Sequence, residues 1–132
     1  MAEFNIPKSG EICWRELASQ DLDAAKSFYK SLFGWDVQPS KLTEVQYNEI
    51  HQGGQAVGGM MAIDKNWGDP LPPSHWTTYI SVDDVDNTVE KITANGGSLK
   101  MPAFDAPNVG RIAYVNDPAG AHFAVIQFVK PS

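Results

Sequence analysis

Aromatic, sulfur-containing and aliphatic residues are interleaved with charged ones from residue 11 to residue 18 (EICWRELA), which predicts a β-strand. Successive side chains of a strand point to opposite faces, so Trp14 and Glu16 share one face and Leu17 lies on the other. The sequence therefore predicts a first strand that presents an indole and a carboxylate side by side.

The next run, residues 22–33, instead repeats its apolar residues at a helical spacing. Asp21 supplies an N-cap side chain, and Gly34 suits the left-handed position that ends many helices. Further strand-like runs follow at residues 35–37, 45–51 and 55–63. The first half of the chain is therefore predicted to be βαβββ.

The same order of elements begins again after residues 64–74, where three prolines and a glycine cannot continue a helix or a sheet ladder. The expected elements are a strand at 75–82, a helix at 85–95, a short strand at 98–101, a proline-containing loop at 102–108 and a hairpin at 109–128. Shifting the chain by 63 residues superposes Asp21 on Asp84 and Gly34 on Gly97. The two halves are therefore predicted to be copies of one plan.

Neither half can cover both faces of its own sheet, so we expect the two modules to curve their sheets around a shared groove. The predicted fold is α+β, with two βαβββ modules forming a curved mixed sheet around the groove and helices outside. Module one spans about residues 10–63, the connector 64–74 and module two about 75–129, within a single domain of 132 residues.

Composition limits the compartment and the partners. The single cysteine, Cys13, cannot pair within the chain and fits a reducing compartment. No apolar run approaches the roughly 20 residues of a membrane span, and residues 1–10 lack a signal-peptide core. With 16 acidic and 10 basic residues the net charge is −6, which repels a phosphate backbone. We therefore expect a cytoplasmic protein that binds neither nucleic acid nor membrane.

The last hairpin carries a resemblance to a known family. Its turn, residues 116–120 (NDPAG), combines a proline that fixes φ with a glycine that tolerates positive φ. The stretch resembles the closing hairpin of the glyoxalase, bleomycin-resistance and extradiol-dioxygenase group, the vicinal oxygen chelate superfamily. The CW-x-EL start, the AAK-x-FY helix, the FGW after it and the VGR before the hairpin are similar to a glyoxalase-like subgroup. The resemblance covers residues 10–128 and implies the same paired-module fold.

The resemblance also implies four metal-ligand positions, one on the first and one on the last strand of each module. They fall on Trp14, on Thr77, within residues 56–63 and on Ala124. An indole, a hydroxyl, a methyl group and a run without imidazole or carboxylate are poor ligands for a divalent ion. The chain also lacks nucleotide-binding and C-x-x-C motifs, so we expect neither a metal nor another cofactor.

Glu16 is the main candidate for chemistry, because a carboxylate facing the groove must be solvated, paired or functional. It either forms a structural ion pair with Arg111 or a nearby lysine, or serves as a substrate anchor or a general base. Arg111 itself is either the cation of the groove or a surface residue. The candidate catalytic residues are Glu16 and Tyr79, and the candidate ligand-binding residues are Trp14, Glu16, Tyr47, Thr77, Tyr79, Phe104 and Arg111. The three histidines, His51, His75 and His122, are expected to be exposed edge residues.

Two hypotheses for function follow, and a third has less support. The first is a protein that binds a small organic molecule of unspecified identity in the groove without a metal. The second is a lyase, isomerase or dioxygenase-type enzyme, using either Glu16 as a metal-free base or metal ligands at other positions. The third is a non-catalytic partner subunit. The sequence is compatible both with pairing of the modules within one chain and with a homodimer.

Overall fold

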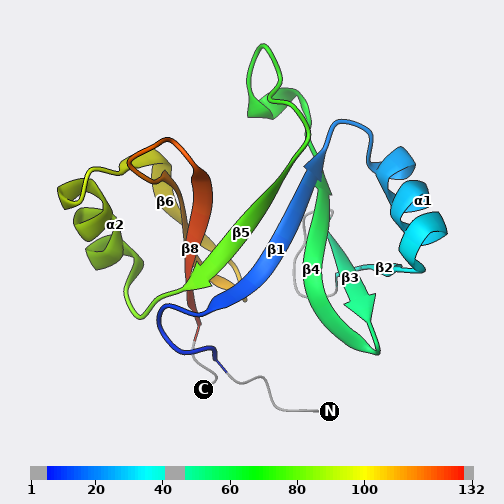
Figure 1. The fold of residues 1–132 in the computed structure, drawn as a ribbon, viewed down its shortest axis with the longest axis horizontal. Coiled ribbons are helices and arrows are strands. Elements are labelled where there is room, and N and C mark those ends of the chain that lie inside the picture. The colour runs from blue at the N-terminus through cyan, green and yellow to red at the C-terminus, as the bar shows by residue number, and fades with distance from the viewer. Residues whose placement is uncertain (1–5, 41–46, 130–132) are drawn as a thin grey trace. The chain divides into compact units, whose positions relative to one another are not determined.

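The computed structural model describes residues 6–40 and 47–129, which fall into two compact units (Figure 1). The first unit runs from Trp14 to Thr77, and the second combines residues 6–13 with residues 78–129. Each unit contains a mixed sheet and one α-helix. The predicted α+β class is confirmed.

The first unit has the predicted βαβββ order. Its elements are most of β1 (Ile12–Ser19), α1 (Leu22–Phe33), β2 (Asp36–Pro39), β3 (Asn48–Gln52), β4 (Gln55–Ala62) and the 3-10 helix η1 (Lys65–Trp67). The strands lie in the order β2-β3-β4-β1, with β1 parallel to β4 and the other pairs antiparallel. The strand predicted at 45–51 begins outside the described residues and is observed as β3.

Both predicted ends of α1 are confirmed. The side chain of Asp21 accepts a hydrogen bond from the backbone N–H of Ala24 (3.0 Å). Gly34 has φ 70° and donates its N–H to the carbonyl of Lys30 (2.8 Å). The helix is therefore fixed at both ends by local contacts that the sequence itself specifies.

The core of the first unit lies on one face of its sheet, under α1. Leu17, Ile50 and Met60 are buried there. Leu22, Ala25 and Tyr29 of α1 pack against them, with Trp35, Val37 and Val57. Because side chains alternate along β1, the opposite face carries Trp14 and Glu16.

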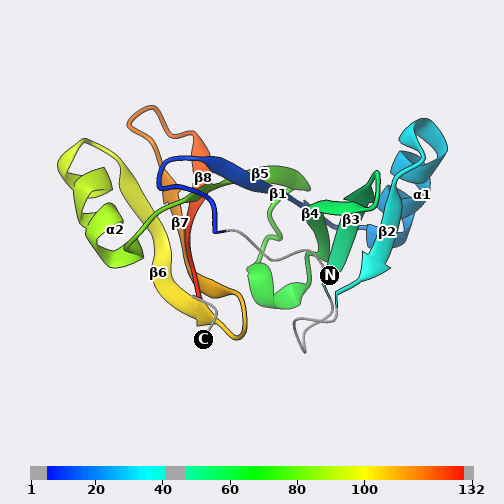
Figure 2. The ribbon, with the colours of Figure 1, turned by 90° about the horizontal axis from the view of Figure 1, so that it is seen from below.

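The second unit repeats the plan. Its elements are the end of β5 (His75–Ser81), α2 (Val85–Ala94), β6 (Ser98–Ala106), β7 (Gly110–Asn116) and β8 (His122–Phe128). The order is β5-β8-β7-β6, and β5 is parallel to β8. Figure 2 shows α2 lying along the β6 side of this unit, where it covers a core of Val85, Ala113, Val115 and Val125. Neither α-helix among the described residues is long and apolar enough to span a bilayer.

The structure corrects the prediction of a loop at residues 102–108. β6 instead continues through Pro102 to Ala106, with register shifts between Leu99 and Met101 and between Met101 and Phe104. β6 is the outer strand of its unit, and a proline is tolerated on such an edge because no ladder hydrogen bond from its nitrogen is needed.

The final hairpin is confirmed in its turn as well as its strands. The carboxylate of Asp117 accepts hydrogen bonds from the backbone N–H groups of Ala119 and Ala121, both at 2.9 Å. Gly120 adopts φ 94°, a conformation that favours glycine. The turn fixes the register in which β7 and β8 pair.

Candidate functional site

The first unit brings three of the predicted site residues together. Trp14 and Glu16 lie on one face of β1, and Tyr47 lies just before β3. The indole Nε1 of Trp14 donates to the Tyr47 hydroxyl (2.9 Å), which in turn donates to Oε2 of Glu16 (2.8 Å). We call this arrangement the Trp14–Tyr47–Glu16 cluster.

A glycine makes room for the phenol of Tyr47. Gly59 of β4 pairs with Glu16 of β1, so the two residues lie side by side in the sheet. A Cβ atom at Gly59 would overlap the hydroxyl and ring of Tyr47. The phenol therefore lies directly on the β4 backbone. Nothing close to Gly59 in the sequence identifies Tyr47 as the side chain that it accommodates.

The carboxylate of Glu16 is buried, with 7% of the residue exposed. Removing a carboxylate from water is costly unless hydrogen bonds replace its hydration, and the Tyr47 hydroxyl supplies one of them. The rings of Trp14 and Tyr47 are half-buried. The cluster thus combines a buried carboxyl group with two half-buried aromatic residues.

The second unit brings together two other predicted residues around one that was not predicted. Tyr79 is 2% exposed, and its hydroxyl lies 2.6 Å from the hydroxyl of Tyr114. The Tyr114 ring lies 6.0 Å from the Phe104 ring and stacks on His122 at 5.8 Å. We call these four residues the Tyr79–Tyr114 cluster.

The sequence analysis missed Tyr114 and placed His122 incorrectly. His122 is half-buried rather than exposed, because it shares the face of β8 on which Tyr114 of the neighbouring strand lies. The same register sets Ala124 opposite both Tyr79 and Tyr114. The alternation of side chains along β7 and β8 indicates which residues of one strand share a face. Only the register between strands shows which side chains of neighbouring strands meet.

The other two histidines are also half-buried rather than exposed. Nε2 of His51 lies 3.1 Å from Oε1 of Glu49, and both side chains are 21% exposed. Nδ1 of His75 lies 2.7 Å from the carbonyl oxygen of Pro73. Each histidine therefore has a local polar partner.

Arg111 forms ion pairs on the surface of the second unit. Its guanidinium contacts Asp86 and Asp105, each at 3.1 Å, and these carboxylates are 67% and 80% exposed. Hydrogen bonds to Asp86, and then to Asp105, raise the pKa of Arg111 above its ordinary value. These ion pairs fit the surface alternative for Arg111. A ligand contact by Arg111 stays a prediction.

The positions that the family resemblance implies for a metal do not fit one. Thr77 is 4% exposed and Ala124 is fully buried, while the indole N–H of Trp14 is bonded to Tyr47. In the described part of the chain, no three His, Cys, Asp or Glu side chains are grouped so that they could hold a metal ion. Hydroxyl, indole and methyl groups bind a divalent ion too weakly to compensate for the loss of its water shell.

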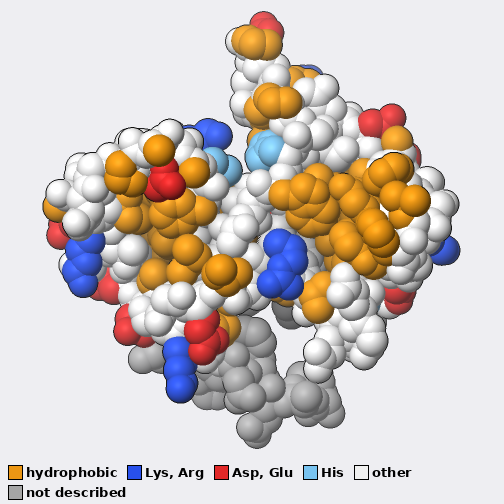
Figure 3. Space-filling model, in the orientation of Figure 1, with side chains coloured by type: hydrophobic (Ala, Val, Ile, Leu, Met, Phe, Trp, Pro, Cys, Tyr) orange, Lys and Arg blue, Asp and Glu red, His pale blue; other side chains and the backbone are white. Residues whose placement is uncertain are grey.

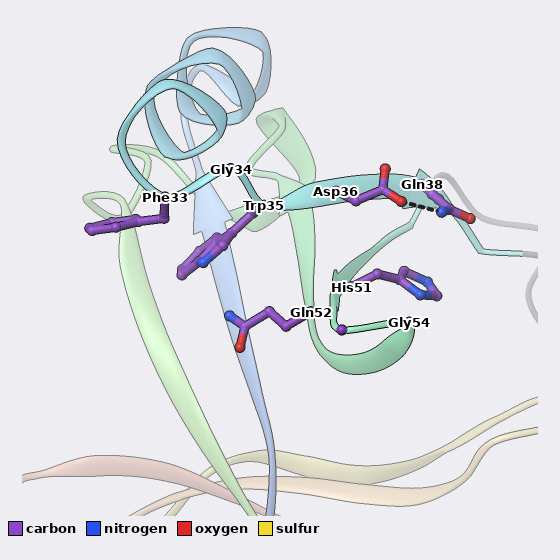
Figure 4. A pocket seen from close by; sticks show the side chains of 9 residues that line it. Phe33, Gly34, Trp35, Asp36, Gln38, His51, Gln52 and Gly54 are labelled. Atoms are coloured by element: carbon purple, nitrogen blue, oxygen red, sulfur yellow. Dashed lines mark hydrogen bonds between the residues drawn. The ribbon is translucent and has the colours of Figure 1, made fainter.

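A hollow of about 570 Å³ opens elsewhere on the first unit, where the sequence predicted no site (Figure 4). It lies at the end of α1, along β2 and beside the β3–β4 turn. Phe33, Trp35, His51 and Gln52 line it. Figure 4 shows Gln52 pointing toward the Trp35 ring and the Asp36 carboxylate pointing away from that ring toward Gln38.

Two βαβββ units, each with its first strand parallel to its last, define the class of paired-module proteins that the sequence resembled. The chain belongs to the Glyoxalase/Bleomycin resistance protein/Dioxygenase superfamily, whose family model matches residues 12–125. The predicted family is confirmed.

Several known proteins are similar to this chain. The "Putative glyoxylase CFP32" of Mycobacterium tuberculosis is 40% identical over 116 residues, covering 86% of this chain and 44% of that protein. The anthracycline biosynthesis protein DnrV of Streptomyces peucetius is 32% identical over 127 residues, covering 88% and 46%. The chain thus spans less than half the length of these relatives. A methylmalonyl-CoA epimerase structure from Mycobacterium tuberculosis superposes with a TM-score of 0.59 at 17% identity, over 98% of this chain and 94% of that one, which shows the shared fold.

Proposed function

We propose that this chain binds a small planar organic molecule at the Trp14–Tyr47–Glu16 cluster, without a resident metal. The observation that supports this is the buried carboxylate of Glu16, which accepts a hydrogen bond from the Tyr47 hydroxyl at 2.8 Å and shares its face of β1 with the half-buried Trp14. Binding sites for small molecules combine apolar walls with a few fixed polar groups, and the cluster has both.

The chemistry of the cluster restricts the ligand. An ionised carboxylate accepts hydrogen bonds and donates none, so the ligand should offer a hydroxyl or N–H group. An anionic ligand would be repelled by Glu16 and by a chain of net charge −6. The faces of Trp14 and Tyr47 favour a flat, aromatic ligand.

One relative supports the same class of ligand. DnrV is named for anthracycline biosynthesis. Anthracyclines are flat, polycyclic molecules that carry phenolic hydroxyl groups. We therefore propose a hydroxylated polycyclic aromatic compound as the ligand class. The other predicted ligand contacts, Thr77 in the first unit and Tyr79, Phe104 and Arg111 in the second, remain candidates.

The test is a titration of the purified protein with 1,8-dihydroxyanthraquinone, followed by calorimetry and by tryptophan fluorescence. The wild-type protein should bind saturably, and both Glu16→Gln and Tyr47→Phe should weaken binding by about tenfold or more, since each removes or neutralises a polar group beside the ligand. No saturable binding by the wild-type protein would contradict the proposal.

Tyr29→Phe is a matched control. The Tyr29 hydroxyl also accepts a hydrogen bond from an indole, that of Trp76 (3.3 Å), but Tyr29 packs on the opposite face of the sheet of the first unit. Its loss should leave the affinity unchanged. Repeating the titration after treatment with a chelator tests whether binding needs a metal. If the chelator abolishes binding and added zinc or ferrous iron restores it, the metal-free part of the proposal is contradicted.

The buried carboxylate also favours a second candidate, an enzyme that uses Glu16 as a general base. A base of this kind would exchange an acidic C–H proton of a bound carbonyl compound with solvent. Proton NMR in D₂O, with hydroxyacetone as the probe, measures this exchange. Exchange by the wild-type protein that Glu16→Gln abolishes would favour the enzyme, whereas a loss of affinity without any exchange would favour the binding protein.

A further inference from the structure

The hollow at the end of α1 shares no lining residue with the Trp14–Tyr47–Glu16 cluster. Its volume of about 570 Å³ lies within the roughly 300–1,000 Å³ of pockets that hold small molecules. All of its lining residues belong to the first unit, from Phe33 at the end of α1 to Gly54 in the β3–β4 turn (Figure 4). The hollow is therefore a separate candidate binding site within one unit.

Aromatic side chains form one wall of the hollow. Figure 3 shows a broad hydrophobic area over the α1 side of the first unit, and Phe33, which lines the hollow, is 61% exposed. The indole of Trp35, also in the lining, stacks on Tyr29 with the ring centroids 4.9 Å apart. Phe33 and Trp76 lie only 6.3 and 5.7 Å from Tyr29, closer than two rings stacked on opposite faces of one indole could be. Among the described residues, the second face of the Trp35 indole therefore carries no aromatic ring.

Polar side chains with open hydrogen-bonding positions line the same hollow. Gln52 points toward the Trp35 ring (Figure 4), and within residues 6–40 and 47–129 its amide forms no hydrogen bond. Nε2 of His51 lies 3.1 Å from Oε1 of Glu49, so it donates to this carboxylate, and Nδ1 of a neutral imidazole is then an acceptor. Asp36 accepts a hydrogen bond from Gln38 through Oδ2 only. The lining thus offers one amide, which both donates and accepts, and two further acceptors.

This lining disfavours three other classes of ligand. An anion would meet the carboxylate of Asp36, and no lysine or arginine is among the described residues that line the hollow. A purely apolar molecule would displace water from the amide, the imidazole and the carboxylate without replacing its hydrogen bonds. A cation binds best over the face of an indole, but the Asp36 carboxylate points away from the Trp35 ring (Figure 4), so one cationic centre cannot contact both. A neutral molecule with several hydroxyl groups fits best.

We propose that this hollow is a second binding site and that its ligand is a neutral sugar in the pyranose form. The C–H groups on one face of a pyranose ring pack on the uncovered face of the Trp35 indole. Each sugar hydroxyl both donates and accepts, which matches the amide of Gln52 and the acceptors of His51 and Asp36. The site shares no residue with the Trp14–Tyr47–Glu16 cluster, so this proposal and the proposed function can each fail without the other.

The test is an NMR titration of ¹⁵N-labelled protein with the methyl glycosides of β-D-glucopyranose, β-D-galactopyranose and α-D-mannopyranose. A single sugar ring makes few contacts, so we expect a Kd of about 1–10 mM and titrate to about 100 mM. At least one glycoside should saturably shift the side-chain amide signals of Gln52 and the indole N–H signal of Trp35, which is assigned from its absence in Trp35→Phe. The indole signal of Trp14, which belongs to the other cluster, should not move.

Gln52→Ala should raise the Kd for the glycoside by about fivefold or more, because it removes only the exposed amide beside the Trp35 ring. Gln55→Ala is the matched control. Gln55 is the register partner of Gln52 across the β3–β4 turn and is also exposed, but it does not line the hollow, so this variant should bind like the wild type.

The proposal is overturned if no glycoside shifts the Trp35 and Gln52 signals saturably. Binding that Gln52→Ala leaves intact, or that Gln55→Ala weakens equally, would place the sugar elsewhere and would also overturn it. Benzyltrimethylammonium serves as the cationic probe, and tighter binding of this ion than of every glycoside would assign the hollow to cations instead. Gln52→Ala should bind 1,8-dihydroxyanthraquinone like the wild type, whereas a loss of that affinity would show that the two sites are not separate.

Discussion

Replacing Gly59 by alanine should displace Tyr47 from the candidate site. A Cβ atom at this position would overlap the hydroxyl and ring of Tyr47. The overlap is with a side chain rather than with the backbone, so the phenol can move while β4 keeps its pairing with β1. We therefore expect Gly59→Ala to yield a folded protein whose Trp14–Tyr47–Glu16 cluster is broken.

The cost follows from the two hydrogen bonds of the Tyr47 hydroxyl. Losing the bond to the buried Glu16 carboxylate costs about 1.5–3 kcal/mol, and losing the bond from the Trp14 indole costs about 0.5–1.5 kcal/mol. Alanine is favoured over glycine within a strand by roughly 0.5–1 kcal/mol, which offsets part of the loss. We expect a net loss of about 2 kcal/mol in the free energy of unfolding, or a melting temperature lower by roughly 6 °C.

A double-mutant cycle isolates the overlap. In a Tyr47→Ala background the phenol is absent, so Gly59→Ala should stabilise the protein by about 0.5–1 kcal/mol instead of destabilising it. The assay is urea unfolding followed by far-ultraviolet circular dichroism for all four proteins. A coupling energy below about 0.5 kcal/mol would refute the reasoning, because Tyr47 could then not be the group that Gly59 accommodates.

Two further predictions concern the helix caps and Arg111. Asp21→Ala and Asp84→Ala should each cost about 1 kcal/mol of unfolding free energy in urea titrations, since each carboxylate accepts a backbone N–H at 3.0 Å. Arg111→Gln should leave the melting temperature unchanged, because both partner carboxylates are largely exposed. The raised pKa of Arg111 means that its ion pairs persist as pH rises until far into the alkaline range, so thermal melts between pH 7 and 10 should show no transition from this group.

The parts of the fold that the sequence predicted are those set by local chemistry. Alternation along β1 predicted that Trp14 and Glu16 share one face, and the side chains of both form hydrogen bonds with the Tyr47 hydroxyl. Asp21 and Gly34 marked the ends of α1 because a capping carboxylate and a left-handed glycine act within a few residues. These signals do not depend on what the rest of the chain does.

The parts that were missed depend on register between strands. Nothing near Tyr114 in the sequence shows that its hydroxyl meets that of Tyr79, because the contact is set by the pairing of both strands with β8. Pro102 indicated a loop, whereas its place on the outer strand of the unit allows β6 to continue. The hydrophobic pattern of α1 predicted a covered face but not how far its outer side is apolar and exposed.

The candidate site and the core of the first unit lie on opposite faces of one sheet. Glu16 and Gly59 pair on the face that carries Tyr47, while the next residues, Leu17 and Met60, pair on the face that α1 covers. The side chains on the two faces do not touch each other, because the backbone of β1 and β4 lies between them. A substitution that only removes a side-chain contact under α1 should therefore lower the stability of the protein and leave ligand affinity at the Trp14–Tyr47–Glu16 cluster unchanged. If a change in this core altered ligand affinity, β1 or β4 would have to shift as a whole, since a strand is the one element that both faces have in common.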